Sequence, residues 1–458
     1  MSTPGGPKRE GNSSAPAAKP RVAVIGAGWS GLAGALEATR RGFAVALFDA
    51  APQAGGRARA IAFRLGDREY VLDNGQHLLI GAYTETLRLM GEAGVDLDDA
   101  LLRLPFEIRY PDGFLLRARR LPAPLHLAAG LLGSSLGWDA RRQALAFAWR
   151  WRRRRWRLDQ DAPASTLFTG APREIVGRLW RPLCLAALNV ELEDASAQVL
   201  LNVLRDSLVG GARAADLLIP RRDLTQIFVA PALRALSARH AELHLRSPIQ
   251  QLTRVDEHWR LESRGATIDV DAVVLALPPE RAADLLASVR RPELDAPVRM
   301  LRSIAMAPIA TVYLRYPPER QLPWPGCALL DDAAAGRYGQ WVFDRGRLDA
   351  GNAGVLSVVI SAAGAALAND TASLAAATAT QLSADLDLPA PLASAVLAEK
   401  RATVVPGPGL QRPSARLPLP ALYLAGDAAA SDYPSTLEGS VRAGLAAARA
   451  LSADLRID

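Results

Sequence analysis

The segment RVAVIGAGWSGLAGALEATRRGFAVALFDA, residues 21–50, predicts a β-strand, an α-helix and a second β-strand in succession. Val22 to Ile25 is a short run with β-branched residues, and the glycine-containing turn after it opens an Ala- and Leu-rich helical stretch. Residues 44–48 form a second apolar run, which ends at Asp49. Together these elements predict a βαβ unit and therefore a parallel central sheet.

The turn between the first strand and the helix carries three glycines in the spacing Gly26-x-Gly28-x-x-Gly31. Gly26 permits the tight turn, Gly28 lets the backbone approach a pyrophosphate, and Gly31 lets the helix pack on the strand. The helix N-terminus offers N–H groups and a positive dipole to the phosphates. Asp49 follows Gly28 by 21 positions, where a carboxylate accepts the ribose hydroxyls. We therefore predict a dinucleotide-binding site rather than a purely structural glycine turn.

NAD and FAD both use this opening, so the residues after the second strand have to distinguish them. Residues 54–59 read AGGRAR, a glycine pair and two arginines. The glycines let the loop pass close to a bound cofactor, and an arginine there pairs with a diphosphate or covers the edge of a flavin. Solvated loop charges are the alternative interpretation of Arg57 and Arg59.

This GGRAR motif resembles the signature of the flavin-dependent amine oxidase and phytoene desaturase superfamily, in which GGRxR follows the ribose-binding acid. Residues 248–279 predict three short alternating strands and then a fully apolar strand. In the superfamily such a unit places a small apolar residue, here Ile249, on the adenine. Residues 422–427, LYLAGD, predict a buried strand that ends in Gly-Asp, and a last helix opens soon after.

The resemblance implies that the cofactor is FAD. It assigns Asp427 to the ribityl and diphosphate region and the start of the last helix to the N1/C2=O edge of the isoalloxazine, where a helix N-terminus stabilises the anionic reduced flavin. No metal site is expected. The residues predicted to bind the cofactor are Gly26, Gly28, Trp29, Ser30, Gly31, Asp49, Ala50, Gly56, Arg57, Asn74, Gly75, Gln76, Ile249, Gly426, Asp427, Thr436 and Leu437.

Three further blocks resemble a narrower group, the hydroxysqualene dehydroxylases of hopanoid biosynthesis. They are VLDNGQHLLIGAY at residues 71–83, WRPLCLAALN at residues 180–189 with ASA at residues 195–197, and YPSTLEGSVRAG at residues 433–444. DNGQH and WRPLCLAALN are the narrower signals, because the cofactor motifs occur throughout the superfamily. The resemblance spans essentially residues 21–451.

The resemblance implies that hydroxysqualene and reduced flavin give squalene, water and oxidised flavin. This reaction needs a long apolar tunnel for a C30 chain, an acid that helps the hydroxyl leave, and a hydride from flavin N5. Because the leaving group is allylic, a stabilised cation is a reasonable intermediate, and a dry pocket would protect it from water. We expect proton transfer first and hydride transfer second.

Four residues are candidates for the acid or its supporting groups. His77 and Asp73, four positions apart, are predicted to be the proton donor and its orienting partner, since imidazolium is a competent acid near neutral pH. Alternatively, Asp73 hydrogen-bonds loop backbone while Gln76 and His77 pack beneath the flavin. Glu438 and Asn189 come next, with structural or cofactor-positioning roles as their alternatives.

Other functions remain open at this point. A desaturase acting on a carotenoid or another isoprenoid would share the tunnel and the flavin but run the hydride in the opposite direction. Amine oxidation is disfavoured because residues 300–313 lack the lysine common in amine-oxidising members and because only 6% of the chain is aromatic. The last alternative is a non-catalytic flavoprotein, or a membrane-bound partner of a prenyl synthase.

Residues 141–157, RRQALAFAWRWRRRRWR, predict a contact with a membrane. At helical spacing Leu145, Trp149 and Trp156 share a face flanked by arginines, which suits an interfacial helix on anionic lipid. The apolar residues 121–138, broken by prolines and glycines, would lie beside it as the tunnel mouth. A solvated basic helix is the alternative, and nucleic-acid binding is disfavoured because no recognition module accompanies the arginines.

The predicted architecture is an α/β fold with a Rossmann-like FAD-binding domain and a discontinuous, largely helical α+β substrate domain. We assign residues 21–82, 216–289 and 401–458 to the first and residues 83–215 and 290–400 to the second. Residues 1–20 are predicted to be a disordered leader without a signal peptide. The expected location is the cytoplasm, peripherally on the inner face of the cytoplasmic membrane. Cys184 and Cys327 are expected to be buried thiols.

Overall fold

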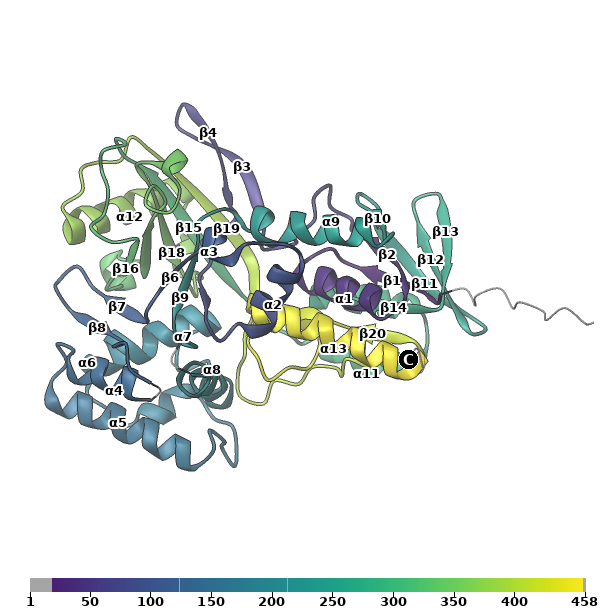
Figure 1. Cartoon of the computed structure of the whole chain (residues 1–458), viewed down its shortest axis with the longest axis horizontal. Helices are drawn as coiled ribbons and strands as arrows, with labels where there is room; N and C mark the ends of the chain where they lie inside the picture. Colours follow the sequence, from purple (N-terminus) through teal and green to yellow (C-terminus); the bar gives the residue numbers. More distant parts are fainter. Residues whose placement is uncertain (1–18, 123, 212, 456–458) are drawn as a thin grey trace, which may run out of the picture.

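A five-stranded parallel sheet in the order β10-β2-β1-β14-β20 forms one half of the structure, a computed structural model that describes residues 19–122, 124–211 and 213–455 (Figure 1). The first 18 residues of the predicted leader lie outside this range. The strands of the sheet, in chain order, are β1 (Arg21–Ile25), β2 (Ala44–Phe48), β10 (Glu242–His244), β14 (Ala272–Leu275) and β20 (Leu422–Leu424). The sheet thus joins segments from the beginning, the middle and the end of the chain.

Alternate residues of these strands pack on opposite faces of the sheet. In β1, Val22 and Val24 join the core cluster of α1 (Trp29–Arg40), α9 (Ala230–Ala238) and α13 (Leu437–Leu455). Ala23 and Ile25 join the cluster on the other face, which is built from a three-stranded antiparallel sheet and from α10 (Pro279–Ser288) and α11 (Asp295–Arg302). Helices and strands therefore cover both faces, as a fully apolar parallel strand requires.

The three-stranded sheet confirms the prediction for residues 248–279. It consists of β11 (Ile249–Val255), β12 (His258–Ser263) and β13 (Ala266–Val270), and β14 follows it directly. Both hairpins pair in antiparallel register along their length. The fully buried Trp259 fills the space between this sheet and the parallel one.

The helices α1 and α13 cross with their backbones in contact. A Cβ atom on Gly444 would lie 2.1 Å from the carbonyl oxygen of Ser30, and one on Gly34 would lie 3.2 Å from the carbonyl oxygen of Gly444. The close approach of the two helices therefore depends on the absence of a side chain at these two positions. It holds the C-terminal helix against the helix that follows the glycine turn.

The other half of the molecule contains a five-stranded antiparallel sheet in the order β16-β17-β18-β15-β19. Helix α12 (Thr371–Leu386) packs on one face of this sheet. β19 runs past the expected boundary at residue 401 and pairs with β15 from Ala393 to Val404. The strands are, in sheet order, Gly326–Ala328, Trp341–Asp344, Val355–Ile360, Met306–Arg315 and Ala393–Val404.

A group of helices lies below this sheet in Figure 1. They are α4 (Leu125–Leu132), α5 (Trp138–Arg153), α6 (Arg173–Ile175), α7 (Arg181–Leu188) and α8 (Ala197–Val209). The helices α2 (Thr84–Glu92) and α3 (Leu97–Ala100) pack instead in the core cluster of the parallel sheet. The remaining strands are β3 (Ala60–Leu65), β4 (Arg68–Asp73), β5 (Leu79–Ile80), β6 (Leu101–Leu104), β7 (Glu107–Arg109), β8 (Leu115–Arg117) and β9 (Leu217–Pro220). Both cysteines are buried and unpaired.

The predicted basic helix is only partly correct. α5 ends at Arg153, and Trp156 lies beyond it with a positive φ of 59° and a buried side chain. Trp156 therefore does not share an exposed face with Leu145 and Trp149, because the chain turns back into the core at this point. Within the described ranges, no helix combines the length and the apolar character needed to cross a membrane.

We predict that Gly444→Ala lowers the melting temperature by several degrees. The added methyl group collides with the backbone of α1, and overpacking of this kind costs about 1–3 kcal/mol. Gly91→Ala in α2 is the matched control, because a Cβ atom there meets no atom within 4 Å. Thermal unfolding followed by circular dichroism measures both; equal melting temperatures for the two variants would contradict the packing argument.

Candidate functional site

In the glycine turn between β1 and α1, the fold requires glycine at two positions, and beside the third it leaves open space. Gly26 has a φ of +108°, and a Cβ atom on Gly31 would lie 1.8 Å from the carbonyl oxygen of Gly26. The nearest atom to a Cβ on Gly28, by contrast, is the Cα of Gly56 at 3.9 Å. The open space beside Gly28 therefore belongs to the site and not to the packing of the fold.

Asp49 ends β2 beside this turn. Its partly exposed carboxylate accepts hydrogen bonds from two backbone N–H groups at 2.7 and 2.8 Å, which hold it in place. The N–H of Ser247 donates to the Asp49 carbonyl oxygen at 2.8 Å. This hydrogen bond brings the start of β11, with the partly exposed Ile249, near Asp49. Ala50 is exposed. This edge offers an acceptor for ribose hydroxyls next to an apolar side chain.

The N-terminus of α1 has no side-chain cap. Its first N–H groups are therefore free to meet an anion, as the helix dipole favours. Trp29 is held by a hydrogen bond from its indole nitrogen to the carbonyl oxygen of Ala58 at 2.8 Å. The buried Ser30 hydroxyl has no hydrogen-bond partner within the described structure, and it would lie 3.6 Å from a Cβ on Gly426.

Arg57 and Asp427 form an ion pair between the GGRAR motif and the strand end of LYLAGD. The Arg57 Nη2 lies 2.6 Å from the Asp427 Oδ2, and its Nη1 donates to the carbonyl oxygen of Ala402 at 2.6 Å. Arg57 is therefore not a solvated loop charge. The neighbouring Arg59 donates to the carbonyl oxygen of Gly56.

These features fit FAD. The open space at Gly28, the uncapped helix and the unpartnered Ser30 hydroxyl suit a diphosphate, and Asp49 suits a ribose. The buried side-chain oxygen of Asn74 likewise lacks a partner within the described residues and lines the adjoining cavity. Unpaired buried polar atoms of this kind are expected where a ligand supplies the missing hydrogen bonds.

A cavity of about 690 Å³ adjoins the flavin motifs and extends away from them between the antiparallel sheet and the helices α4, α5, α7 and α8. Gly75, Gln76, Thr436 and Leu437 line its inner end, so the N-terminus of α13 opens on it. Thr436 accepts a hydrogen bond from the N–H of Gly439 and thereby caps that helix. The predicted cofactor-binding residues near the isoalloxazine thus share one cavity.

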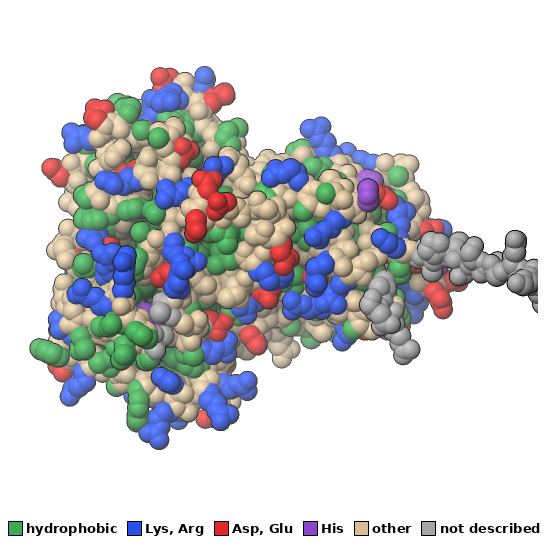
Figure 2. All heavy atoms as spheres, viewed as in Figure 1, with side chains coloured by type: hydrophobic (Ala, Val, Ile, Leu, Met, Phe, Trp, Pro, Cys, Tyr) green, Lys and Arg blue, Asp and Glu red, His purple; other side chains and the backbone are tan. Residues whose placement is uncertain are grey.

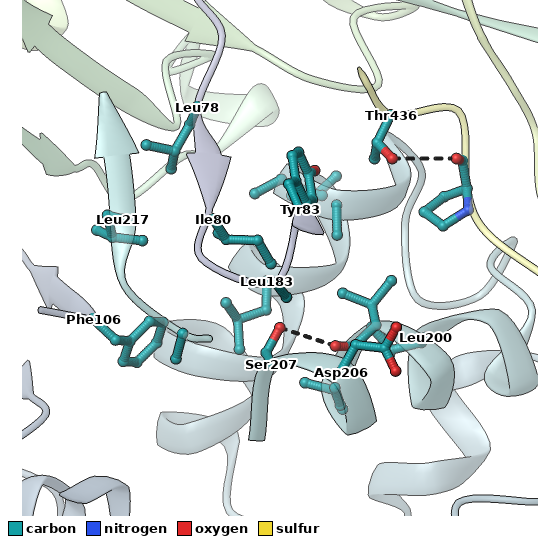
Figure 3. Close-up of a pocket in the computed structure, with 18 of the residues that line it drawn as sticks. Leu78, Ile80, Tyr83, Phe106, Leu183, Leu200, Asp206, Ser207, Leu217 and Thr436 are labelled. Carbon is teal, nitrogen blue, oxygen red and sulfur yellow. Dashed lines mark hydrogen bonds between the residues drawn. The ribbon is translucent and has the colours of Figure 1, made fainter. Parts of the chain in front are cut away.

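The walls of the cavity are mainly apolar (Figure 3). Five of the apolar side chains are Leu78 just before β5, Ile80 in β5, Leu183 in α7, Leu200 in α8 and Leu217 in β9. On the antiparallel sheet, alternation along the strands decides which side chains face the cavity. Trp341, Phe343 and Val359 line it, while Val342 and Val358 pack toward α12.

His77 lines the cavity with one ring nitrogen already bound. Its Nδ1 lies 2.7 Å from the carbonyl oxygen of Gly75, and because a carbonyl only accepts, the proton resides on Nδ1. The described structure shows no partner for Nε2. Burial lowers the pKa of His77, although the hydrogen bond to Gly75 opposes the shift. The ring is therefore mainly neutral at pH 7, with Nε2 as an acceptor.

Asp73 does not orient His77, contrary to the prediction. It is buried at the end of β4, where its carboxylate accepts a hydrogen bond from the N–H of Leu224 at 2.7 Å. Burial raises the pKa of Asp73 to about 7, although this backbone hydrogen bond and the charge of Arg345 oppose the shift. Asp73 does not line the cavity, so its bonding matches the alternative in which it holds loop backbone.

Glu438 and Asn189 are also held in structural contacts. The Glu438 carboxylate, fully buried, accepts hydrogen bonds from the N–H and hydroxyl of Thr86 and so caps α2. Asn189 ends α7 in the left-handed conformation. Its side chain donates to Pro308 and Thr403 and accepts from the N–H of Ala362. Glu438 lies outside the cavity lining and Asn189 has no free polar group, so the contacts of both match the structural alternatives given for them.

Two residues that the sequence did not single out emerge from the geometry. The Tyr83 ring faces the cavity, and burial raises the pKa of its hydroxyl to about 12 despite a hydrogen bond to Thr436. Arg345 is buried and donates to the Gln76 side-chain oxygen at 3.0 Å, and this hydrogen bond fixes Gln76 at the inner end of the cavity. No sequence pattern marks Arg345, because it lies 269 positions from Gln76.

The fold and the site define an FAD-dependent oxidoreductase. The chain belongs to the flavin containing amine oxidoreductase family, which matches residues 29–452. FAD is therefore its cofactor, as the sequence predicted.

Individual relatives agree with this assignment. The chain is 31% identical over 444 residues to a hydroxysqualene dehydroxylase of Rhodopseudomonas palustris, covering 93% of this chain and 97% of the relative. It is 26% identical over 257 residues to a zeta-carotene desaturase of Zea mays, covering 50% and 42%. A solved oxidoreductase from Methanosarcina mazei shares the fold with a TM-score of 0.74 and 16% identity, over 93% of this chain and 99% of that one. The predicted resemblance to hydroxysqualene dehydroxylases is confirmed.

We predict that Gly28→Ala leaves the fold intact but weakens FAD binding about tenfold or more. The methyl group occupies only open space in the protein, yet it would stand where backbone N–H groups approach a diphosphate, and each lost charge-assisted hydrogen bond costs about 1.5–3 kcal/mol. Titration of the apoprotein with FAD, followed by flavin fluorescence, measures the affinity. Gly91→Ala controls for added helix propensity. An unchanged affinity of Gly28→Ala for FAD would show that the diphosphate does not bind at this turn.

Proposed function

We propose that the protein reduces hydroxysqualene to squalene, with loss of the hydroxyl as water. The observation that carries this proposal is the cavity, whose mainly apolar walls extend from the flavin motifs to exposed side chains of α5 and α8. Bound reduced FAD would supply the hydride and become oxidised, so that hydroxysqualene and reduced FAD give squalene, water and oxidised FAD. The relative from Rhodopseudomonas palustris supports the same reaction.

The charges along the cavity favour a neutral substrate over an ammonium ion. Four carboxylates line it, and three of them, Glu107, Asp206 and Asp427, each pair with an arginine. The fourth, Glu399, accepts a hydrogen bond from the backbone N–H of Arg401. A cationic substrate would have to compete with these arginines for the same oxygens. Lys400 is exposed, and no lysine lines the cavity in the part of the chain that the structure describes.

The cavity contains a pair of aromatic rings, although the chain is poor in aromatic residues. The low aromatic content suggested a site without paired rings, yet Trp341 and Phe343 both line the cavity, with ring centroids 6.3 Å apart and planes 19° apart. They are two positions apart on β17 and therefore share its inner face. The case for a neutral isoprenoid thus rests on the apolar walls and on the arginine partners of three of the four lining carboxylates.

His77 is the proton donor in this proposal. Of the four candidates it alone lines the cavity with an unbound polar atom, the ring nitrogen Nε2. When protonated, Nε2–H would donate to the substrate hydroxyl while Nδ1–H stays on Gly75 and holds the ring orientation. Apolar walls keep water from a developing allylic cation.

A desaturase is the second candidate, because the zeta-carotene desaturase of Zea mays is a relative and an extended polyene would fit the same walls. It differs in the direction of electron flow. A desaturase removes hydride from its substrate, whereas dehydroxylation delivers it. The oxidation state of flavin that reacts with each substrate therefore separates the two functions.

We predict that the anaerobic, photoreduced holoenzyme is reoxidised by hydroxysqualene in a single turnover and forms squalene in equal amount. Flavin absorbance at about 450 nm and chromatography of the product measure the two events. A linear carotene precursor offered to the oxidised holoenzyme is the matched reaction in the other direction. Flavin reduction by that compound, with no reoxidation by hydroxysqualene, would replace the proposal with desaturation.

We predict that the single-turnover rate falls with rising pH above the lowered pKa of His77. The reactive imidazolium becomes about tenfold scarcer for each pH unit above that pKa, so the rate follows the same slope. His77→Gln, with FAD bound, should lose most of the rate and the pH dependence together. His258→Gln, at an exposed histidine outside the cavity, is the control; full activity in His77→Gln would assign the proton to another group.

A further inference from the structure

The exposed apolar side chains of the protein are concentrated on α4, α5 and the end of α8. Of the ten large hydrophobic residues that are exposed in the described structure, seven fall between positions 121 and 209. We call them the apolar face: Leu121, Leu125, Leu132, Trp138, Leu145, Trp149 and Val209. Trp138 is 76% exposed and Trp149 is 62% exposed. Contiguous apolar surface of this kind marks an interaction site.

The positions on α5 explain why these side chains point the same way. Trp138, Leu145 and Trp149 are separated by seven and four residues, which places them on one side of the helix. The opposite side, including Phe147 and Trp151, packs into the core. Figure 2 shows hydrophobic side chains interspersed with arginines over the region that α4 and α5 occupy in Figure 1.

The cavity opens through this face. Leu145, Trp149 and Val209 both line the cavity and are exposed to solvent. The inner end of the same cavity is lined by His77 and Thr436. A molecule that enters between α5 and α8 therefore reaches the flavin end past mainly apolar side chains, with Arg152 and Asp206 among the few charged ones.

Arginines surround the apolar face with almost no opposing charge. Residues 119–158 contain ten arginines and one acidic residue, a net charge of +9, whereas the whole chain carries +7. Nine of these arginines are exposed. Within the described residues, Arg150 and Arg152 to Arg155 have no carboxylate within the distance of an ion pair, although Arg153 stacks on Trp149 at 4.7 Å from the ring centroid. The surface thus presents cations without internal partners.

We propose that this face lies on a lipid bilayer that contains anionic lipids, with the cavity mouth opening into the membrane. Exposed tryptophans and leucines bury in the interface while flanking arginines bind anionic headgroups. A nucleic acid would use the arginines but would leave Leu125, Leu132 and Val209 in water. That the substrate enters from the membrane rests on the proposed function; binding of the bilayer does not.

Vesicle co-sedimentation of the holoenzyme tests the proposal. We expect binding to vesicles of phosphatidylcholine and phosphatidylglycerol at low salt, weaker binding at high salt, and little binding to phosphatidylcholine alone. Leu125→Ser/Trp138→Ser should weaken binding about tenfold or more, because neither side chain would then enter the interface. The control Val71→Ser/Leu392→Ser removes side chains that are 60% and 59% exposed elsewhere, and it should leave binding unchanged.

The arginines are tested in the same way. Arg150→Gln/Arg153→Gln should bind anionic vesicles about tenfold or more weakly and show a smaller salt dependence, since both arginines would lie near the anionic headgroups. Arg234→Gln/Arg264→Gln removes two exposed arginines outside this surface and serves as the control.

Three outcomes would overturn the proposal. They are no binding to anionic vesicles at low salt, equal loss of binding in the test and control variants, or tight binding of single-stranded DNA that anionic vesicles do not displace. The catalytic reaction is tested separately from membrane binding.

Leu125 and Trp138 do not line the cavity. The double variant should therefore turn over detergent-dispersed hydroxysqualene normally and fail only with substrate in vesicles. Vesicle binding by a protein that never forms squalene would refute the proposed reaction alone.

Discussion

The contact between the backbones of α1 and α13 is the constraint on which the site depends. Because Gly34 and Gly444 have no side chains, two helices from opposite ends of the chain come close together. Carbonyl oxygens of the facing helix lie where the Cβ atoms of other residues would be. This approach sets the uncapped start of α1 and the start of α13 on the same side of the parallel sheet. The turn predicted to bind the diphosphate and the helix start predicted to meet the isoalloxazine are thereby held together, although they lie more than 400 residues apart in the sequence.

The cavity combines mainly apolar walls with a few fixed polar groups. His77, Asn74 and the Arg57–Asp427 ion pair lie at its inner end, while Glu107, Arg152 and Asp206 interrupt walls otherwise formed by Leu, Ala and aromatic side chains. Alternation along β17 and β18 supplies part of these apolar walls, because residues that face the cavity and residues that face α12 follow one another in each strand. A long neutral chain can occupy such a cavity without leaving a buried charge unpaired.

Buried polar residues around the site mainly hold chain segments together. Asp73 binds the backbone at Leu224, Glu438 caps α2, and Asn189 bridges α7 to three other segments. In a sequence, such residues resemble catalytic groups, because acids and amides inside apolar surroundings occur in both roles. Only their hydrogen-bond partners distinguish the two, and those partners lie up to 353 positions away.

The amino-acid sequence alone determined the nucleotide-binding unit. The spacing of Gly26, Gly28 and Gly31 and the strands around them are local patterns, so period and turn chemistry were enough to predict the parallel sheet and a dinucleotide site. The choice of FAD came from the resemblance of the GGRAR motif to the flavin-dependent superfamily. The pairing of His77 with Gly75 rather than Asp73, the turn that buries Trp156 and the side chains that line the cavity were decided only by the tertiary structure. The physical reason is that hydrogen-bond partners and burial are set by contacts between distant segments, which no local pattern encodes.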